Sequence, residues 1–315
     1  MLPVKIQVQN NHLPDSPGVY FYYDRAGELL YIGKATSLKK RVGSYFVKAH
    51  DDRIGEMVSQ IARIDYIETP TVIEALVLEA NQIKTKKPKY NILERDDKSF
   101  LYLVITNEDY PRPLLMRGQE LERLGIDPFR AKLTDKTKKK FLAVFGPYTS
   151  GSSLKKALDL IRKFIPWSDC WPPEATGRKR ACFNVHLRKC PGVCTGAISK
   201  KDYRRIIKHL IMFFEGKKLQ LIRQMEKEMK QASKAQEYER AADLRNKIGA
   251  LKHIRDVALI VKEDFELPVT RVKEEMIDLD GRIEAYDISN ISGTSSVGSM
   301  VVFDEGVPAR DKYRK

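Results

Sequence analysis

The sequence predicts an α/β protein in which a small mixed sheet flanked by helices is followed by a cysteine-rich α/β segment, a two-helix hairpin and a terminal pair of strands. Three observations predict it. Strand-like alternation precedes helical periodicity in the first hundred residues, all 4 cysteines lie within 25 residues, and residues 203–257 are almost free of proline and glycine. These changes of pattern divide the chain into four expected domains: 1–100, 101–205, 206–256 and 257–315.

The composition indicates a polyanionic partner. The chain of 315 residues carries 57 Lys+Arg against 42 Asp+Glu, a formal net charge of +15, so nucleic acid is the expected partner and a generally basic protein is the alternative. No apolar run reaches the roughly 18 residues that span a bilayer. Residues 1–5 lack the basic-then-apolar order of a signal peptide, so we expect a cytoplasmic protein without a membrane partner.

The first domain begins with a predicted hairpin. Val19, Phe21 and Tyr23 alternate along a strand, residues 24–27 carry turn signals, and residues 29–32 return as a second strand. Two helices near residues 38–46 and 54–61 and a short strand at 64–67 complete the pattern. The first of these helices has three cations for an exposed face: Lys39, Lys40 and Arg41.

A third helix carries the most informative carboxylate of the chain. Thr71 and Glu74 have the spacing of a capping box, and the helix they begin is expected to run to about Lys84. Glu79 lies on its apolar face with Leu76, and a buried carboxylate is costly unless it is paired or holds a metal.

Later elements follow the same reasoning. Residues 100–115 alternate like strands, residues 154–165 have amphipathic helical spacing, and a lysine-rich stretch at 132–140 is expected to be a solvated loop rather than a specific phosphate contact. A break near 233–236 predicts two antiparallel helices. Two strands are expected at residues 283–288 and 299–303.

Several residues of the first domain could together hydrolyse a phosphodiester. Glu79 could bind a metal, Arg41 could neutralise a phosphate, and Tyr20 and Tyr31 could orient or deprotonate a water. Each has a structural alternative. Glu79 could pair with a nearby cation (Lys34, Lys84 or Arg41), Arg41 could be solvated, and the tyrosines could simply pack on a strand.

The combination of these residues resembles a known family. Gly18-Val19-Tyr20 and Tyr31-Ile32-Gly33 resemble the GIY-YIG nuclease domain, and the match continues through Arg41, residues 78–81 and residues 87–91. The fuller pattern is similar to UvrC, an excinuclease subunit of bacterial nucleotide excision repair. The resemblance implies hydrolysis of damaged duplex DNA on the 3′ side of a lesion, in complex with UvrB.

The resemblance also implies roles by position. Glu79 binds one divalent cation, Mg²⁺ or Mn²⁺, and Arg41 neutralises the charge on the phosphorus centre. Tyr31, helped by Lys34 or the metal, activates the water, and Tyr20 orients it. The implied catalytic set is Tyr20, Tyr31, Lys34, Arg41, Glu79 and Asn91, the last closing the site through a side-chain hydrogen bond.

The cysteines lie at Cys170, Cys182, Cys190 and Cys194, with gaps of eleven, seven and three residues. Four clustered thiolates suit either Zn²⁺ or an iron–sulfur cluster, and buried free thiols are the alternative. The resemblance to UvrC implies a [4Fe–4S] cluster in preference to zinc. It also places the neighbouring cations on a DNA-facing knob: Arg178, Lys179, Arg180, Arg188 and Lys189.

Residues 238–245 resemble the UVR motif, although a coiled-coil spacer would have similar patterning. The resemblance implies that this hairpin docks onto UvrB. The implied contact residues are Tyr238, Glu239, Ala241, Ala242 and Arg245.

Residues 286–290 resemble the opening strand of the RNase H-like domain that makes the second UvrC incision, with Asp287 at the first catalytic position. Such a site needs further carboxylates from later strands, so we expect no activity from Asp287 in this chain. We therefore expect an amino-terminal portion of UvrC. The alternatives are a short stand-alone homologue that makes only the 3′ cut, as the Cho endonuclease does, and a non-catalytic adaptor for DNA and UvrB.

Overall fold

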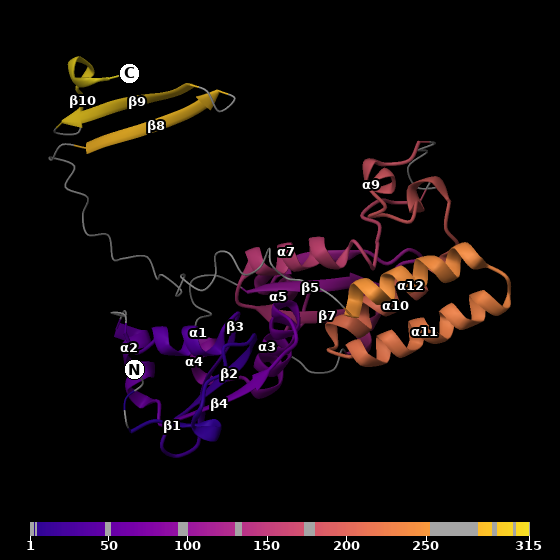
Figure 1. Cartoon of the computed structure of the whole chain (residues 1–315), viewed down its shortest axis with the longest axis horizontal. Coiled ribbons are helices and arrows are strands. Elements are labelled where there is room, and N and C mark those ends of the chain that lie inside the picture. The colour runs from indigo at the N-terminus through magenta and orange to yellow at the C-terminus, as the bar shows by residue number, and fades with distance from the viewer. Residues whose placement is uncertain are drawn as a thin grey trace. The chain divides into compact units, whose positions relative to one another are not determined.

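The computed structural model describes residues 3, 5–47, 52–93, 100–129, 134–172, 180–252, 283–291, 295–304 and 307–314. The chain divides into two compact units, Met1–Glu266 and Leu267–Lys315 (Figure 1). The first unit contains two sheets and a group of long helices, and the second is a small antiparallel sheet.

The first sheet contains the predicted hairpin. Its strands are β1 (Gln7–Val8), β2 (Gly18–Tyr23), β3 (Leu29–Ala35) and β4 (Arg63–Glu68), in the order β1-β4-β2-β3. Strand β2 is antiparallel to both neighbours and β1 is parallel to β4, so the expected mixed sheet is confirmed. Strand β3 lies at the edge, which leaves its outward-facing backbone groups without a strand partner.

Helices begin where the sequence provides caps. The Ser37 hydroxyl accepts from the Lys40 N–H at the start of α1, and the Thr71 hydroxyl accepts from the Glu74 N–H at the start of α3. Helix α3 ends at Lys87, which has a left-handed backbone with φ of 51°. The helices of this region are α1 (Leu38–Ser44), α2 (Asp52–Gln60), α3 (Val72–Lys86) and α4 (Lys89–Leu93).

Helix α3 belongs to two hydrophobic cores. Ala75 and Ile83 pack with the apolar face of the first sheet. On the other side, Val72, Leu76 and Ala80 join the core of the second sheet and the long helices. A helix buried on both sides is held more firmly than a surface helix, and this is the helix that carries Glu79.

The second sheet has the order β6-β5-β7 and is antiparallel throughout. Its strands are β5 (Leu101–Thr106), β6 (Pro113–Arg117) and β7 (Phe141–Tyr148). Helices α5 (Gly118–Arg123), α6 (Asp135–Lys140) and α7 (Gly151–Ile161) accompany them.

The expectation of a loop in the lysine-rich stretch is wrong for residues 135–140, which form α6. The Thr134 hydroxyl caps this helix by accepting from the Thr137 N–H, and Lys138 pairs with Asp135 at 3.0 Å. Local capping therefore outweighs the repulsion between lysines. Lys132 lies outside the described residues.

Three long helices follow: the predicted antiparallel pair is present, and a separate helix that was not predicted precedes it. Gly216 adopts φ of +77° and separates the first from the second, whereas the break at 233–236 lies where it was expected. The helices are α10 (Lys200–Phe214), α11 (Lys218–Lys234) and α12 (Tyr238–Lys252), and α11 and α12 run side by side as an antiparallel hairpin (Figure 1). The expected domain boundary at 205/206 falls inside α10.

The second unit contains β8 (Ile283–Ile291), β9 (Ser295–Asp304) and β10 (Val307–Pro308) in the order β10-β9-β8. Both predicted strands are present, and Asp287 pairs in register with Ser299. Across the part of the chain that the structure describes, no helix combines the length and apolar character needed to traverse a bilayer.

Candidate active site and metal centre

A cluster of four tyrosines lies on β2, β3 and α1. The rings of Tyr20, Tyr22, Tyr31 and Tyr45 have centroid separations from 5.0 to 6.5 Å. The hydroxyls of Tyr20 and Tyr45 are 3.0 Å apart and share a hydrogen bond. A Cβ on Gly33 would lie 2.3 Å from the Tyr20 hydroxyl, so the glycine allows this phenol to lie directly against β3.

The Arg41 guanidinium joins this cluster. It lies 5.5 Å from the centroid of the Tyr45 ring and is half-buried, so the expectation of a solvent-facing Arg41 is wrong, whereas Lys39 and Lys40 are exposed as expected. Burial opposes its charge, but interaction with Tyr20, Tyr45 and Tyr31 outweighs burial and raises the pKa of Arg41. A fixed positive charge therefore lies beside the phenols.

Tyr20 keeps its proton at neutral pH. Burial, followed by the neighbouring Tyr45, raises the pKa of the Tyr20 phenol well above its ordinary value, and Arg41 offsets this only in part. A phenol in this state can orient a water through hydrogen bonds, which suits the role that the resemblance implies for Tyr20.

The Glu79 carboxylate is buried, with 2% of the residue exposed. Its Oε1 accepts from the Lys34 backbone N–H at 3.0 Å, and the Thr149 hydroxyl lies 3.3 Å from each carboxylate oxygen. Of the cations considered as partners, the Lys84 ammonium instead donates to the Val144 carbonyl at 2.8 Å.

Asn91 is fully buried and holds the same strand. Its Oδ1 accepts from the Ile32 N–H at 2.8 Å, and its Nδ2 donates to the Ile32 carbonyl at 2.9 Å. Asn91 and Glu79 thus bind alternate residues, Ile32 and Lys34, along the free edge of β3. Two of the expected site residues therefore satisfy backbone N–H and C=O groups that the edge strand would otherwise leave unpaired.

The donor set around Glu79 suits a hard divalent cation. Two of its hydrogen-bond donors are the Lys34 amide and the Thr149 hydroxyl, which are both neutral groups. Among the described residues the cysteines form the one group of three or more metal-ligating side chains, so a cation at Glu79 would keep several waters as ligands.

Three residues close to the site were not predicted: Tyr22, Tyr45 and Thr149. Tyr45 follows Arg41 by one helical turn, a spacing that could have identified it. Thr149 is 70 positions from Glu79 in the sequence, and no local pattern connects them.

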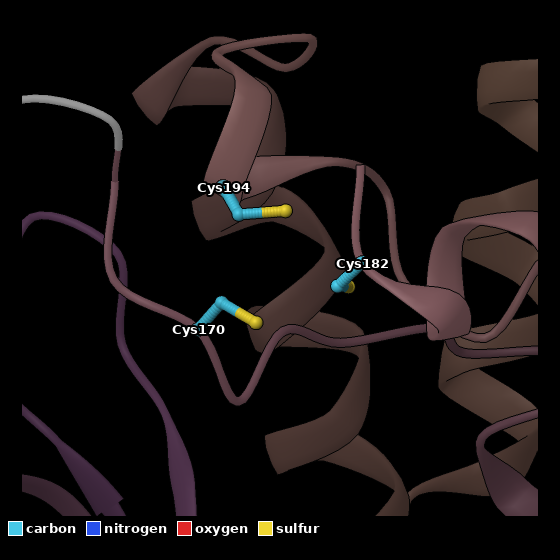
Figure 2. Close-up of side chains that lie close together, drawn as sticks. All are labelled: Cys170, Cys182 and Cys194. Carbon is cyan, nitrogen blue, oxygen red and sulfur yellow. The ribbon is translucent and has the colours of Figure 1, made fainter. Parts of the chain in front are cut away.

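Three of the four cysteines come together. The Sγ atoms of Cys170, Cys182 and Cys194 lie within 4.8 Å of one another (Figure 2), whereas buried Cys190 lies outside this group. Burial raises the pKa of Cys170 to about 11. At Cys182 burial acts in the same direction, but hydrogen bonds from the Val185 N–H and the neighbouring thiols outweigh it and lower the pKa. The trio fits a thiophilic metal or cluster.

Of the expected cations around the cysteines, Arg180 and Arg188 are exposed and Lys189 is half-buried, while Arg178 and Lys179 lie outside the described residues.

The expected partner-binding residues lie at the start of α12. Tyr238 is 67% exposed, Glu239 and Arg245 are also exposed, and Ala241 and Ala242 are half-buried. The side chain of Asp287 lies outside what the structure describes.

Comparison with known proteins matches four family models in order along the chain. They are described as the UvrC-like GIY-YIG domain (residues 16–92), the UvrC/Cho excinuclease middle domain (100–213), the UvrB/uvrC motif (220–254) and the UvrC RNAse H endonuclease domain (274–315). UvrABC system protein C from Acetivibrio thermocellus is 38% identical over 266 residues. The chain belongs to the UvrC family.

The match covers most of this chain but only part of each UvrC relative. The Acetivibrio alignment spans 83% of this chain and 40% of the relative. UvrABC system protein C from Carboxydothermus hydrogenoformans is 41% identical over 77% of this chain and 37% of its own length. Among solved structures, the magnesium-bound GIY-YIG N-terminal endonuclease domain of UvrC from Thermotoga maritima is 35% identical, covering 25% of this chain and 86% of that chain with a TM-score of 0.24.

Proposed function

We propose that this chain is a UvrC-type DNA endonuclease whose GIY-YIG domain hydrolyses a phosphodiester on the 3′ side of a lesion, in the cytoplasm and in complex with UvrB. One observation carries the proposal. The edge strand β3 holds a buried carboxylate, Glu79, at Lys34, and a buried phenol, Tyr20, against the adjacent Gly33. Arg41 places a permanent cation in the same phenol cluster.

Each residue has a role that follows from its surroundings. Glu79 would hold Mg²⁺ or Mn²⁺, which supplies Lewis-acid stabilisation of the scissile phosphate when bound. Arg41 stabilises the negative charge that develops on the phosphate oxygens. Tyr20, which stays protonated, orients the attacking water, and Tyr31, ionised to the phenolate with help from Lys34, would accept the proton of that water. Asn91 keeps β3 in place through Ile32.

The nuclease proposal is tested by nicking a lesion-bearing duplex with UvrB and Mg²⁺ present. We expect Glu79→Gln to abolish the 3′ nick and to leave UvrB binding intact, because the substitution removes the metal-binding charge but keeps the shape. Undiminished nicking by this variant would refute the site. Full UvrB-dependent DNA binding without a nick by the unaltered chain would favour the adaptor function instead.

The cysteine trio and Cys190 are proposed to hold a [4Fe–4S] cluster, with Zn²⁺ as the alternative. The three sulfurs within 4.8 Å of one another support this, because thiolates are the usual ligands of both. Measuring iron, sulfide and zinc in anaerobically purified protein decides between them, and a protein lacking all three would contradict both.

The hairpin of α11 and α12 is proposed to dock onto UvrB. Tyr238 is a large aromatic side chain that remains 67% exposed at the start of α12, beside the exposed Glu239. Tyr238→Ala should weaken UvrB binding, measured by calorimetry, without lowering the melting temperature.

A further inference from the structure

We propose that Thr149 is a positioning residue of the nuclease metal site, so that the site is completed by a part of the chain outside the GIY-YIG domain. The inference rests on the proposed function of Glu79. The GIY-YIG match ends at residue 92, and Thr149 lies within the middle-domain match of residues 100–213. The nuclease site therefore draws on two domains.

The contact itself is symmetric. The Thr149 hydroxyl is 3.3 Å from Glu79 Oε1 and 3.3 Å from Glu79 Oε2. The Lys34 N–H binds Oε1 alone, at 3.0 Å. The Lys34 N–H thus contacts one carboxylate oxygen of Glu79, and the Thr149 hydroxyl contacts both. Together the two donors restrict rotation of the carboxylate about its terminal bond.

Thr149 is held on both sides by ordered neighbours. Tyr148, the last residue of β7, is buried. Ser150 caps α7 by accepting from the Ser153 N–H. Thr149 is thus the single residue between a strand and a helix cap, with little freedom to move away from Glu79.

Polar contacts, as well as the shared core, join helix α3 to β7, α10 and α11. The Lys84 ammonium donates to the Val144 carbonyl of β7 at 2.8 Å. Asn81 donates to the Phe214 carbonyl at 3.2 Å, and Lys218 pairs with Glu74 at 2.8 Å. These contacts lie before and after Glu79 on the helix, so the distance between Glu79 and Thr149 is set by the fold.

A hydroxyl that orients a metal-binding carboxylate affects metal affinity. Loss of such an outer contact typically weakens metal binding by about 10- to 100-fold. Because the two distances of 3.3 Å are long for a hydroxyl donor, we expect the lower end, about tenfold, for Thr149→Val. Thr149→Ser keeps the hydroxyl and should bind within about threefold of the unaltered chain.

The test measures Mn²⁺ binding by electron paramagnetic resonance on the full chain without DNA. Manganese prefers oxygen ligands, so the cysteine cluster should contribute little to the signal. Thr85→Val is the matched control, because Thr85 lies on α3 and its hydroxyl donates to the Asn81 carbonyl, not to Glu79. We expect Thr85→Val to bind Mn²⁺ as the unaltered chain does.

Two outcomes would overturn the inference: Thr149→Val binding Mn²⁺ as tightly as the unaltered chain, or Thr149→Ser losing as much affinity as Thr149→Val. Glu79→Gln separates this failure from a failure of the proposed function. If Glu79→Gln keeps its Mn²⁺, the metal site itself is wrong. If Glu79→Gln loses Mn²⁺ while Thr149→Val retains it, only the role of Thr149 is wrong. Where Thr149→Val weakens Mn²⁺ binding as expected, nicking against Mg²⁺ concentration should show a raised Mg²⁺ requirement in that variant and an unchanged rate at saturation.

Discussion

Replacing Asn91 by alanine tests whether this side chain acts by holding β3 in place. The variant loses two hydrogen bonds, at 2.8 and 2.9 Å, and leaves the buried N–H and carbonyl of Ile32 without partners. An unsatisfied buried polar group costs about 1–3 kcal/mol, so the two together should lower the free energy of unfolding by about 2–6 kcal/mol.

The assay is native-state hydrogen exchange, which reports β3 separately from the rest of the chain. The Ile32 amide should lose most of its protection in Asn91→Ala, and nicking should fall because Tyr31 and Gly33 flank Ile32 on the same strand. Asn107→Ala is the matched control, because Asn107 is exposed and its side chain donates to the Lys138 carbonyl. Its cost should stay below about 1 kcal/mol. Unchanged protection at Ile32, or a loss as small as that of the control, would show that the reasoning is wrong.

Three further predictions follow from the same contacts. Gly33→Ala should disturb the Tyr20 phenol, because its Cβ would lie 2.3 Å from that hydroxyl, and nicking should fall while near-ultraviolet circular dichroism of the tyrosines changes. Burial lowers the pKa of Lys84 to about 8 from 10.5, so the unfolded chain binds the extra proton between these values and stability should rise with pH there by up to about 3 kcal/mol. Urea unfolding at pH 8 and 10 should show this rise, and Lys84→Met should remove it. Arg41→Gln should lower nicking by about 10²- to 10³-fold with Mn²⁺ binding intact, and a loss of metal binding would contradict a role on the phosphate.

Much of the fold could be predicted because its signals are local. Alternation and turn residues predicted β2 and β3, and the spacing of Thr71 and Glu74 predicted the start of α3. The lysine-rich segment failed as a prediction because a charge run was given more weight than the cap at Thr134. Helix α10 could not be predicted as a separate helix, because a single glycine within a helical pattern, Gly216, does not reveal the sign of its φ.

The six expected catalytic residues divide in a similar way. Tyr20, Arg41 and Glu79 could be named because their chemistry and order resemble a family motif. Their burial and protonation could not be predicted. The position of Arg41 against the tyrosines, and hence the pKa of Arg41, depends on which face of α1 meets the sheet.

The sequence by itself determined the family, the order of the domains and the residue types at the nuclease site, because short-range periodicity and motif spacing carry that information. Only the tertiary structure decided that three cysteines meet while Cys190 lies apart, and that Thr149 reaches Glu79. The reason is that sheet register and helix packing join residues far apart in the chain, and no local pattern encodes those distances. Strand β3 illustrates the two kinds of information. Its motif residues are determined by the sequence, whereas the contacts of its edge with Asn91 and Glu79 are determined by the fold.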